Sequence, residues 1–385
     1  MRLRILGIMI PIIIIVFFYG MAVGVYEYFP YEGLNQTKKI ILNEGIDESV
    51  ITSTSFEKFN TSSIIEIETI EDLNSKKTSL IKYIWKTDSL PSKLPDSVQK
   101  NFSDIRFENI ENLEHIEKIE VSMDYTVCKN ICIEHDINLN SNPYLFLPEK
   151  SNNKLIIYHQ GHAGGFVLGK DTISHFLKEG YSVLAFSMPL VGDNNQPMVD
   201  LDRFGKIKLK DHDQLVLLET SDSQSPIKFF VEPIAVSLNY IDKNYNFESY
   251  YMVGISGGGW TTVLYSAIDE RISQAYSVAG SYPIYLRYDA KNLGDYEQIN
   301  PNLYKIANYL ELYVMGSYGD DRKLVQIFNK YDPCCFDGEL YQSYEDELKR
   351  KVSNLQKGKF KIYLDDSHKE HKISENALRI ILKSM

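Results

Sequence analysis

Ser256 stands in a pattern that is typical of an acyl-transfer nucleophile. Residues 254–258 read Gly-Ile-Ser-Gly-Gly, after a short apolar run (250–255) and before a helix-compatible segment (260–268). This is the G-x-S-x-G pattern between a strand and a helix. The turn is so tight that the residues two before and two after the serine must be small, as both glycines are. It also sets the hydroxyl at a helix N-terminus, where free N–H groups favour developing negative charge.

Such a serine needs a base and an acid that orients the base. Asp332 follows an expected strand, 324–328, after a short turn. Catalytic groups gather at this carboxyl end of the strands in open α/β sheets. We therefore expect Asp332 to be the acid. Asp320 and Asp321 are alternatives, because residues 312–315 could themselves form a strand.

The base should follow the last strand, and two histidines do so. The expected strand 359–364 runs into a loop that contains His368 and His371. We expect His371 to be the base, because it lies directly before the segment that begins the final helix. His368 is the alternative.

The oxyanion of an acyl-transfer intermediate needs two N–H donors. The loop 160–164 reads Gln-Gly-His-Ala-Gly and follows an expected strand, 155–159. Its two glycines allow the bend that points amides inward. We expect His162 or Ala163 to supply one N–H and Gly257 the other.

Strands alternate with helices along residues 118–385, which predicts a mostly parallel sheet with right-handed crossovers. The expected strands are 119–126, 144–147, 155–159, 181–186, 250–255, 272–278, 324–328 and 359–364. The expected helices are 172–178, 228–244, 260–268, 339–355 and 373–382. Residues 188–201 have the composition of a loop, and 281–322 have apolar spacing that could place helices over the site.

Taken together, these motifs resemble the α/β-hydrolase superfamily over residues 118–385. The resemblance rests on G-x-S-x-G, the glycine-rich loop and the order Ser256, Asp332, His371. It implies an α/β-hydrolase fold, with a mostly parallel central sheet and helices on both faces. It implies a serine hydrolase that cleaves an ester, or less readily an amide, through a Ser-His-Asp triad and an acyl-enzyme. The loop begins His-Gln-Gly-His, where many lipases and esterases have His-Gly-Gly-Gly, so the second oxyanion donor stays open.

The N-terminus predicts a membrane segment. An unbroken apolar run from Ile5 to Val25 is near the roughly 20 residues needed to span a bilayer. We interpret residues 1–25 as a transmembrane signal-anchor. Arg2 and Arg4 precede the run, so the positive-inside rule puts the catalytic domain outside the cytoplasm. The alternative is a cleaved signal peptide and a secreted protein. Residues 26–117 are polar, and we interpret them as a spacer or a small accessory region.

Composition limits the partners. The 385 residues are 44% hydrophobic with a net charge of −11, and no basic tract favours nucleic acid. We expect a small-molecule or glycan ester as substrate, the membrane as a partner, and no cofactor or metal. The cysteines are Cys128, Cys132, Cys334 and Cys335. We do not expect the adjacent Cys334 and Cys335 to pair with each other; either could pair with Cys128 or Cys132 in an oxidising compartment.

Three other readings compete. Residues 164–170 match G-x-x-x-x-G-K, but Asp171 stands where a nucleotide-binding loop has Ser or Thr. The pairs His159/His162 and His368/His371 are H-x-x-H sequences that could serve a metal-dependent hydrolase, although no longer metal motif accompanies them. The third is a catalytically inactive α/β-hydrolase-like module that only binds.

Overall fold

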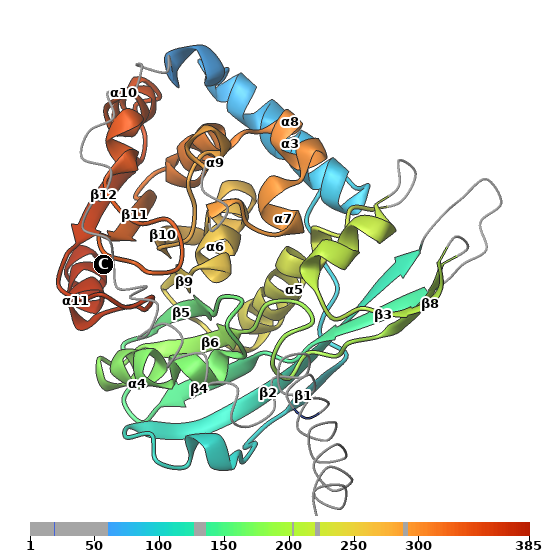
Figure 1. Ribbon diagram of the computed structural model, residues 1–385. Coiled ribbons are helices and arrows are strands. Elements are labelled where there is room, and N and C mark those ends of the chain that lie inside the picture. Colours follow the sequence, from blue (N-terminus) through green and yellow to red (C-terminus); the bar gives the residue numbers. More distant parts are fainter. Residues whose placement is uncertain (1–18, 20–60, 127–135, 202–203, 220–223, 288–291) are drawn as a thin grey trace, which may run out of the picture. The chain divides into compact units, whose positions relative to one another are not determined.

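A ten-stranded sheet forms the centre of the chain (Figure 1). The computed structural model describes residues 19, 61–126, 136–201, 204–219, 224–287 and 292–385. The strand order is β1-β2-β4-β6-β5-β9-β10-β11-β12, with β3 paired to β2. The strands are β1 (Ser97–Gln99), β2 (Leu113–Thr126), β3 (Asp136–Ser141), β4 (Tyr144–Pro148), β5 (Lys154–His159), β6 (Ser182–Phe186), β9 (Ser249–Ile255), β10 (Ile272–Val278), β11 (Lys323–Asn329) and β12 (Lys359–Asp365).

The part of the sheet from β6 to β12 is parallel, and the part from β1 to β4 is antiparallel. The central parallel strands β5 and β6 are apolar and buried along nearly their whole length, because both faces of the sheet are covered there. β5 leads to β6 on one side, and the chain then crosses to β9 on the other side. This reversal makes the carboxyl ends of β5 and β9 a topological switch point, where open α/β sheets place their ligand sites.

Helices cover both faces of the sheet, as predicted. One face packs against α4 (Lys170–Lys178) and α11 (Glu375–Ser384), whose apolar residues join those of β4, β6 and β11 in one cluster. The other face packs against α5 (Lys228–Asn244), α6 (Gly257–Ile268), α9 (Tyr309–Ser317) and α10 (Glu345–Asn354). Every residue of α6 is buried, so this helix lies in the middle of the second layer.

The segment between β10 and β11 is helical, as its apolar spacing predicted. It holds α7 (Tyr296–Ile299), α8 (Pro301–Ile306) and α9. Residues 312–315, which we considered as a strand, lie inside α9. The stretch expected to be a loop at 188–201 ends in β7 (Met198–Leu201), which pairs with β8 (Gly205–Lys208) as a hairpin. The 3₁₀ helix η4 (His212–Leu218) follows.

The described residues between 61 and 385 belong to one compact unit. The boundary expected between residues 117 and 118 lies inside β2, so the sheet continues across it. The helix α3 (Ile70–Trp85) precedes it, lies against α8 and contributes Leu80 and Ile84 to the core (Figure 1). The predicted membrane segment 1–25 lies outside the described residues, apart from Tyr19. Within the described ranges, no helix is both long and apolar enough to cross a bilayer.

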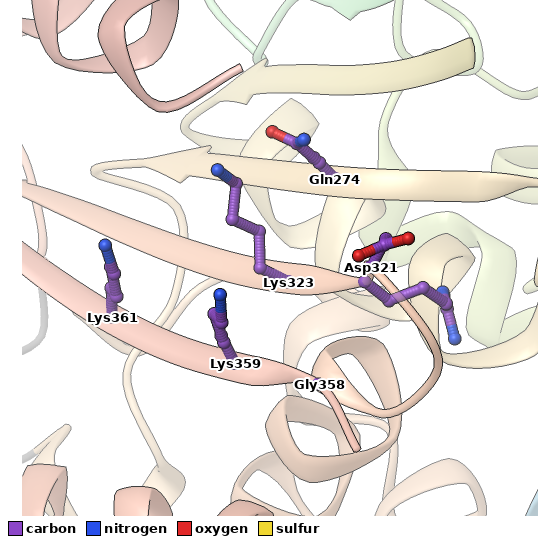
Figure 2. A pocket seen from close by; sticks show the side chains of 7 residues that line it. Gln274, Asp321, Lys323, Gly358, Lys359 and Lys361 are labelled. Carbon is purple, nitrogen blue, oxygen red and sulfur yellow. The ribbon is translucent and has the colours of Figure 1, made fainter. Parts of the chain in front are cut away.

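The amino ends of the parallel strands carry a basic pocket of about 360 Å³ (Figure 2). Lys323 on β11 is paired in register with Lys359 on β12, and Lys361 follows two residues along the same face. Burial, together with Lys361 and Lys359, lowers the pKa of Lys323. This pocket lies at the end of the sheet opposite to that of Ser256.

Candidate active site

Ser256 lies on the turn between β9 and α6 and has a left-handed backbone, with φ 55° and ψ −127°. Side chains at the flanking glycines would collide with backbone. A Cβ at Gly254 would lie 2.1 Å from the Gly258 carbonyl oxygen, and one at Gly258 would lie 2.1 Å from the His159 carbonyl oxygen. The expectation that both neighbours must be small is confirmed. The strained backbone of Ser256 is kept in place by β9 before it and by α6 after it, and α6 is buried along its whole length.

The loop after β5 lies directly on this turn. A Cβ at Gly161 would be 2.6 Å from Ser256 Cβ, so only glycine allows this approach. The Gly257 amide begins α6 and therefore has no carbonyl partner within that helix. His162 and Ala163 follow Gly161 in the same loop. The three predicted oxyanion residues thus lie in the two segments that meet at Ser256, while their donor role stays a prediction.

Asp332 and His371 are brought together by neighbouring strands. Asn329 at the end of β11 is paired with Asp365 at the end of β12, and the two loops that follow carry the acid and the base. His371 Nδ1 lies 2.7 Å from Asp332 Oδ2. Because an ionised carboxylate only accepts, Nδ1 carries the proton and Nε2 is left as an acceptor. Nε2 is buried and has no hydrogen-bond partner among the described residues.

The Asp332 carboxylate is fully buried and is held on both oxygens. The backbone amides of Cys334 and Cys335 donate to Oδ1 over 2.8 and 3.4 Å. Asn329 Nδ2 donates to Oδ2 over 3.2 Å and to the Lys372 carbonyl over 3.0 Å, which ties the acid's loop to that of the base. The sequence predicted Asp332 as the acid, but Asn329 was not singled out.

The expectation for the cysteines was wrong in one respect. Cys334 and Cys335 are joined in a disulfide. Their two amides converge on one oxygen of Asp332, and this turn brings the adjacent side chains together. Cys128 and Cys132 lie outside the described residues, so a pairing with them is not part of the structure.

The alternative acid and base lie elsewhere. Asp320 is 77% exposed and pairs with Lys357 at 2.7 Å, before β11 begins, at the amino end of the strands. His368 faces Asp365, with Nε2 3.4 Å from Oδ2. Neither contacts Asp332 or His371 in the hydrogen bonds of the described chain.

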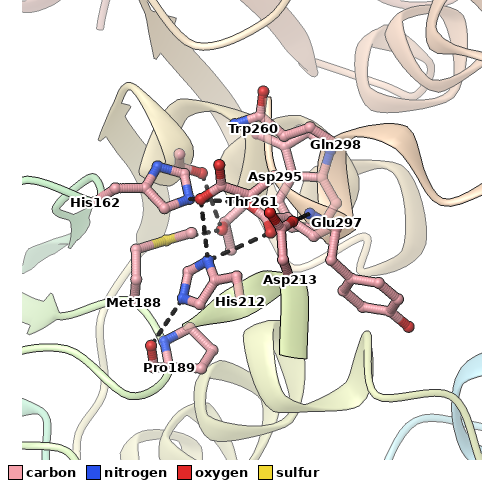
Figure 3. A network of polar contacts seen from close by, with 12 residues as sticks. His162, Met188, Pro189, His212, Asp213, Trp260, Thr261, Asp295, Glu297 and Gln298 are labelled. Carbon is pink, nitrogen blue, oxygen red and sulfur yellow. Dashed lines mark hydrogen bonds and ion pairs between the residues drawn. The ribbon is translucent and has the colours of Figure 1, made fainter. Parts of the chain in front are cut away.

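His162 belongs to a polar network that the sequence did not reveal (Figure 3). Its Nε2 lies 2.8 Å from Glu297 Oε1 and 3.2 Å from Asp295 Oδ2, and His212 Nδ1 lies 3.3 Å from Glu297 Oε2. Burial lowers the pKa of His212, but Glu297, then the hydrogen bond to the Pro189 carbonyl, and then Asp295 outweigh burial and raise it to about 8. Burial raises the pKa of Glu297, whereas His212 and His162 bring it well below its usual range.

The two H-x-x-H pairs do not form metal sites of their own. His159 is buried and stacks on Phe186, and its Nδ1 lies 2.9 Å from the Gln160 carbonyl oxygen. Burial lowers the pKa of His159 to about 4. Within the described ranges, neither pair falls in one group of three or more potential ligands. The two such groups are Cys334, Cys335 and His371, and His162, His212, Asp295 and Glu297.

Comparisons with known proteins agree with this architecture. No family of proteins matches the sequence, and no curated protein matches it. Acetyl xylan esterase 1 from a Thermoanaerobacterium species is 14% identical, with a TM-score of 0.51, over 84% of this chain and 97% of the esterase. An acetyl xylan esterase from a Paenibacillus species is 12% identical, with a TM-score of 0.46, over 84% of this chain and 98% of that one.

A Pyrococcus furiosus esterase is 16% identical, with a TM-score of 0.43, over 69% of this chain and 89% of the esterase. Of these three structures, the first alone has a TM-score above 0.5. At this identity the likeness concerns the fold and not the activity. Together with the sheet order and the turn at Ser256, it shows that the chain has the fold of the α/β-hydrolase superfamily.

Proposed function

We propose that this protein is a serine hydrolase that cleaves a carboxylic ester, with Ser256 as nucleophile, His371 as base and Asp332 as the acid that orients His371. The observation that carries the proposal is the His371 ring: its Nδ1 is bound to a buried carboxylate, while its buried Nε2 has no partner in the described chain. An imidazole held in this tautomer is what a hydroxyl nucleophile requires.

The proposed mechanism gives each of these residues one role. Ser256 Oγ attacks the acyl carbonyl while His371 Nε2 takes the hydroxyl proton. The carbonyl oxygen becomes an oxyanion, which the Gly257 amide and an amide of His162 or Ala163 would stabilise. The protonated His371 then donates to the leaving alkoxide, which departs as the alcohol. His371 next takes a proton from water, and the hydroxide attacks the acyl-enzyme. His371 then returns this proton to Ser256 Oγ as the bond to the acyl group breaks, which releases the acid and restores Ser256.

The proposed substrate is a small-molecule or glycan ester. A solved structure of similar fold bears the name acetyl xylan esterase 1, which supports acetylated sugars as a first class to screen. We also propose that residues 5–25 anchor the chain in a membrane, with the catalytic domain outside the cytoplasm. The support is the apolar run after Arg2 and Arg4. A cleaved signal peptide and secretion are the alternative.

A fluorophosphonate probe tests the nucleophile and chooses the base. We expect the full-length protein in detergent to be labelled, and Ser256→Ala to abolish the labelling. His371→Ala should reduce the labelling rate by at least about 1,000-fold, since a serine without its base loses most of its activation. Asp332→Asn should reduce it by up to about 10,000-fold, because the tautomer is then wrong.

His368→Ala is the matched control, because this histidine faces Asp365 and should leave labelling unchanged. Loss of labelling in His368→Ala but not in His371→Ala would show that His368, and not His371, is the base. A folded wild-type protein that is not labelled would contradict the hydrolase and favour a module that only binds.

A further inference from the structure

Four potential metal ligands converge beside the nucleophile turn from three separate segments (Figure 3). His162 comes from the loop after β5, His212 from the start of η4, and Asp295 and Glu297 from the start of α7. One ligand atom from each lies within 4.8 Å of all the others. This arrangement is not explained by the Ser-His-Asp mechanism, which does not use these side chains.

The spacing of the four ligand atoms fits one small ion. Zn²⁺ binds His nitrogen and carboxylate oxygen at about 2.0–2.2 Å, usually with four ligands in a tetrahedron, so neighbouring ligand atoms lie about 3.3 Å apart. His162 Nε2 lies 2.8 Å from Glu297 Oε1 and 3.2 Å from Asp295 Oδ2, and His212 Nδ1 lies 3.3 Å from Glu297 Oε2 and 3.8 Å from Asp295 Oδ2. One ligand atom from each side chain lies within 4.8 Å of the others, so the four side chains would close around the ion.

Two buried atoms of the group have no hydrogen bond among the described residues. The Glu297 side chain is fully buried and His212 is 3% exposed. His212 Nδ1 and Glu297 Oε2 lie 3.3 Å apart as an ion pair, and Asp295 Oδ2 lies 3.8 Å from the same nitrogen, but neither Nδ1 nor Oε2 makes a hydrogen bond within the described chain. A buried polar atom without a partner is costly, and a shared cation would satisfy both.

The second ring nitrogen of His212 is arranged as in a metal-bound histidine. Its Nε2 lies 2.8 Å from the Pro189 carbonyl oxygen, which can only accept, so Nε2 carries the proton. When an ion displaces the proton that Glu297 and Asp295 favour on Nδ1, the lone pair of this nitrogen points toward Glu297. Metal-binding histidines usually donate their other N–H to a carbonyl or carboxylate in this way. The two carboxylates also balance the charge of a divalent ion.

From these contacts we propose that His162, His212, Asp295 and Glu297 bind one Zn²⁺ ion. The ion would fasten the loop that carries the oxyanion amides to η4 and α7. These two elements are already joined, because Asp213 Oδ1 accepts from the Tyr296 amide over 2.9 Å. The His162 ring also lies on the nucleophile turn, since a Cβ at Gly257 would be 2.3 Å from His162 Cε1. The site therefore positions the loop and takes no part in the chemical steps.

Metal titration of the full-length protein in detergent tests the site. The protein is stripped with a chelator and titrated with Zn²⁺ by calorimetry, and with Co²⁺ by visible absorption. We expect one equivalent of Zn²⁺ and the absorption bands of four-coordinate Co²⁺. His212→Gln and Glu297→Gln should weaken binding at least about 100-fold, because loss of a residue outside the ligand shell already costs 10–100-fold. Zn²⁺ should raise Tm in wild type but not in these variants.

His115→Gln, a partly exposed histidine on β2, is the matched control and should bind as wild type. If a variant does not fold, His162→Gln replaces it, since that ring is 28% exposed. Folded wild type that binds no Zn²⁺, or Glu297→Gln that binds as tightly as wild type, would overturn the proposal. Thiolate-to-cobalt absorption would also overturn it, since it would place the ion on cysteines instead. Fluorophosphonate labelling of the same samples reports Ser256 separately.

Discussion

At the end of a parallel strand, burial sets the protonation state of one histidine side chain. His159, the last residue of β5, is buried against Phe186 and has no carboxylate partner in the hydrogen bonds and ion pairs of the described chain. Burial lowers its pKa from 6.5 to about 4. The folded protein therefore resists protonation of this ring, which the unfolded chain accepts readily.

Stability should fall with acidification because of this histidine. A depressed pKa contributes stability that is fully present above the unfolded pKa of 6.5 and is lost as the pH falls through the folded pKa of about 4. The full contribution is about 3 kcal/mol. Denaturant unfolding of wild type and His159→Gln between pH 8 and pH 4 measures it. The stability of the variant should depend less on pH, whereas His115→Gln should follow wild type; parallel curves for all three would contradict the assignment.

At the scale of elements, α3 shows how the N-terminal region joins the domain. Thr69 begins the helix with a capping box: its hydroxyl accepts from the Asp72 amide over 3.2 Å, and Asp72 Oδ2 accepts from the Thr69 amide over 2.9 Å. At the other end, Trp85 Nε1 donates to Glu232 Oε2 over 2.9 Å. Glu232 lies on α5, so α3 is bonded to the second helical layer.

Removal of the cap should therefore destabilise the whole domain. We expect Thr69→Ala to lower the free energy of unfolding by about 1 kcal/mol, as the loss of a cap usually does. Thr78→Ala, on an exposed turn of the same helix, is the matched control and should have no such cost. A separate early transition in Thr69→Ala, with the main transition unchanged, would show instead that α3 unfolds independently.

The elements near the site were largely predictable, because their signals are local. Residues 228–244 and 272–278 were predicted as helix and strand with the observed bounds. The juxtaposition of Asp332 and His371 followed from chain order on parallel strands. Chain order on parallel strands could not reveal His212, Asp295 and Glu297. Their segments are far apart in the sequence, and only the folded chain brings them together. The packing of α3 was also missed: its apolar residues were visible, but nothing in the sequence says which helix they contact.

At the scale of the molecule, the order of β6, β5 and β9 gathers the site at one edge of the sheet. The basic pocket around Lys323 and Lys359 lies at the opposite ends of the strands (Figure 2). A substrate ester therefore has to reach the edge that carries α7 and the loop after β5. The proposed anchor precedes all of these elements in the chain.

Alkaline carbonate extraction tests the anchor. We expect the full-length protein to stay with the membranes in carbonate and to be released by detergent, because the run 5–25 would be integrated in the bilayer. Replacement of residues 1–25 by a cleavable signal peptide is the control and should give soluble protein. A mature wild-type N-terminus beyond residue 25, found by mass spectrometry in the soluble fraction, would establish secretion instead.

The glycine contacts around Ser256 also determine what remote relatives of this chain have to share. Gly161 touches the nucleophile, and Gly258 touches the last carbonyl of β5, so a methyl group at either would displace a strand, a loop or a helix. A core leucine can become an isoleucine at little cost, but these positions have no substitute. Natural selection should therefore preserve them long after the surrounding sequence has drifted, and they should be the last traces of common ancestry at 14% identity.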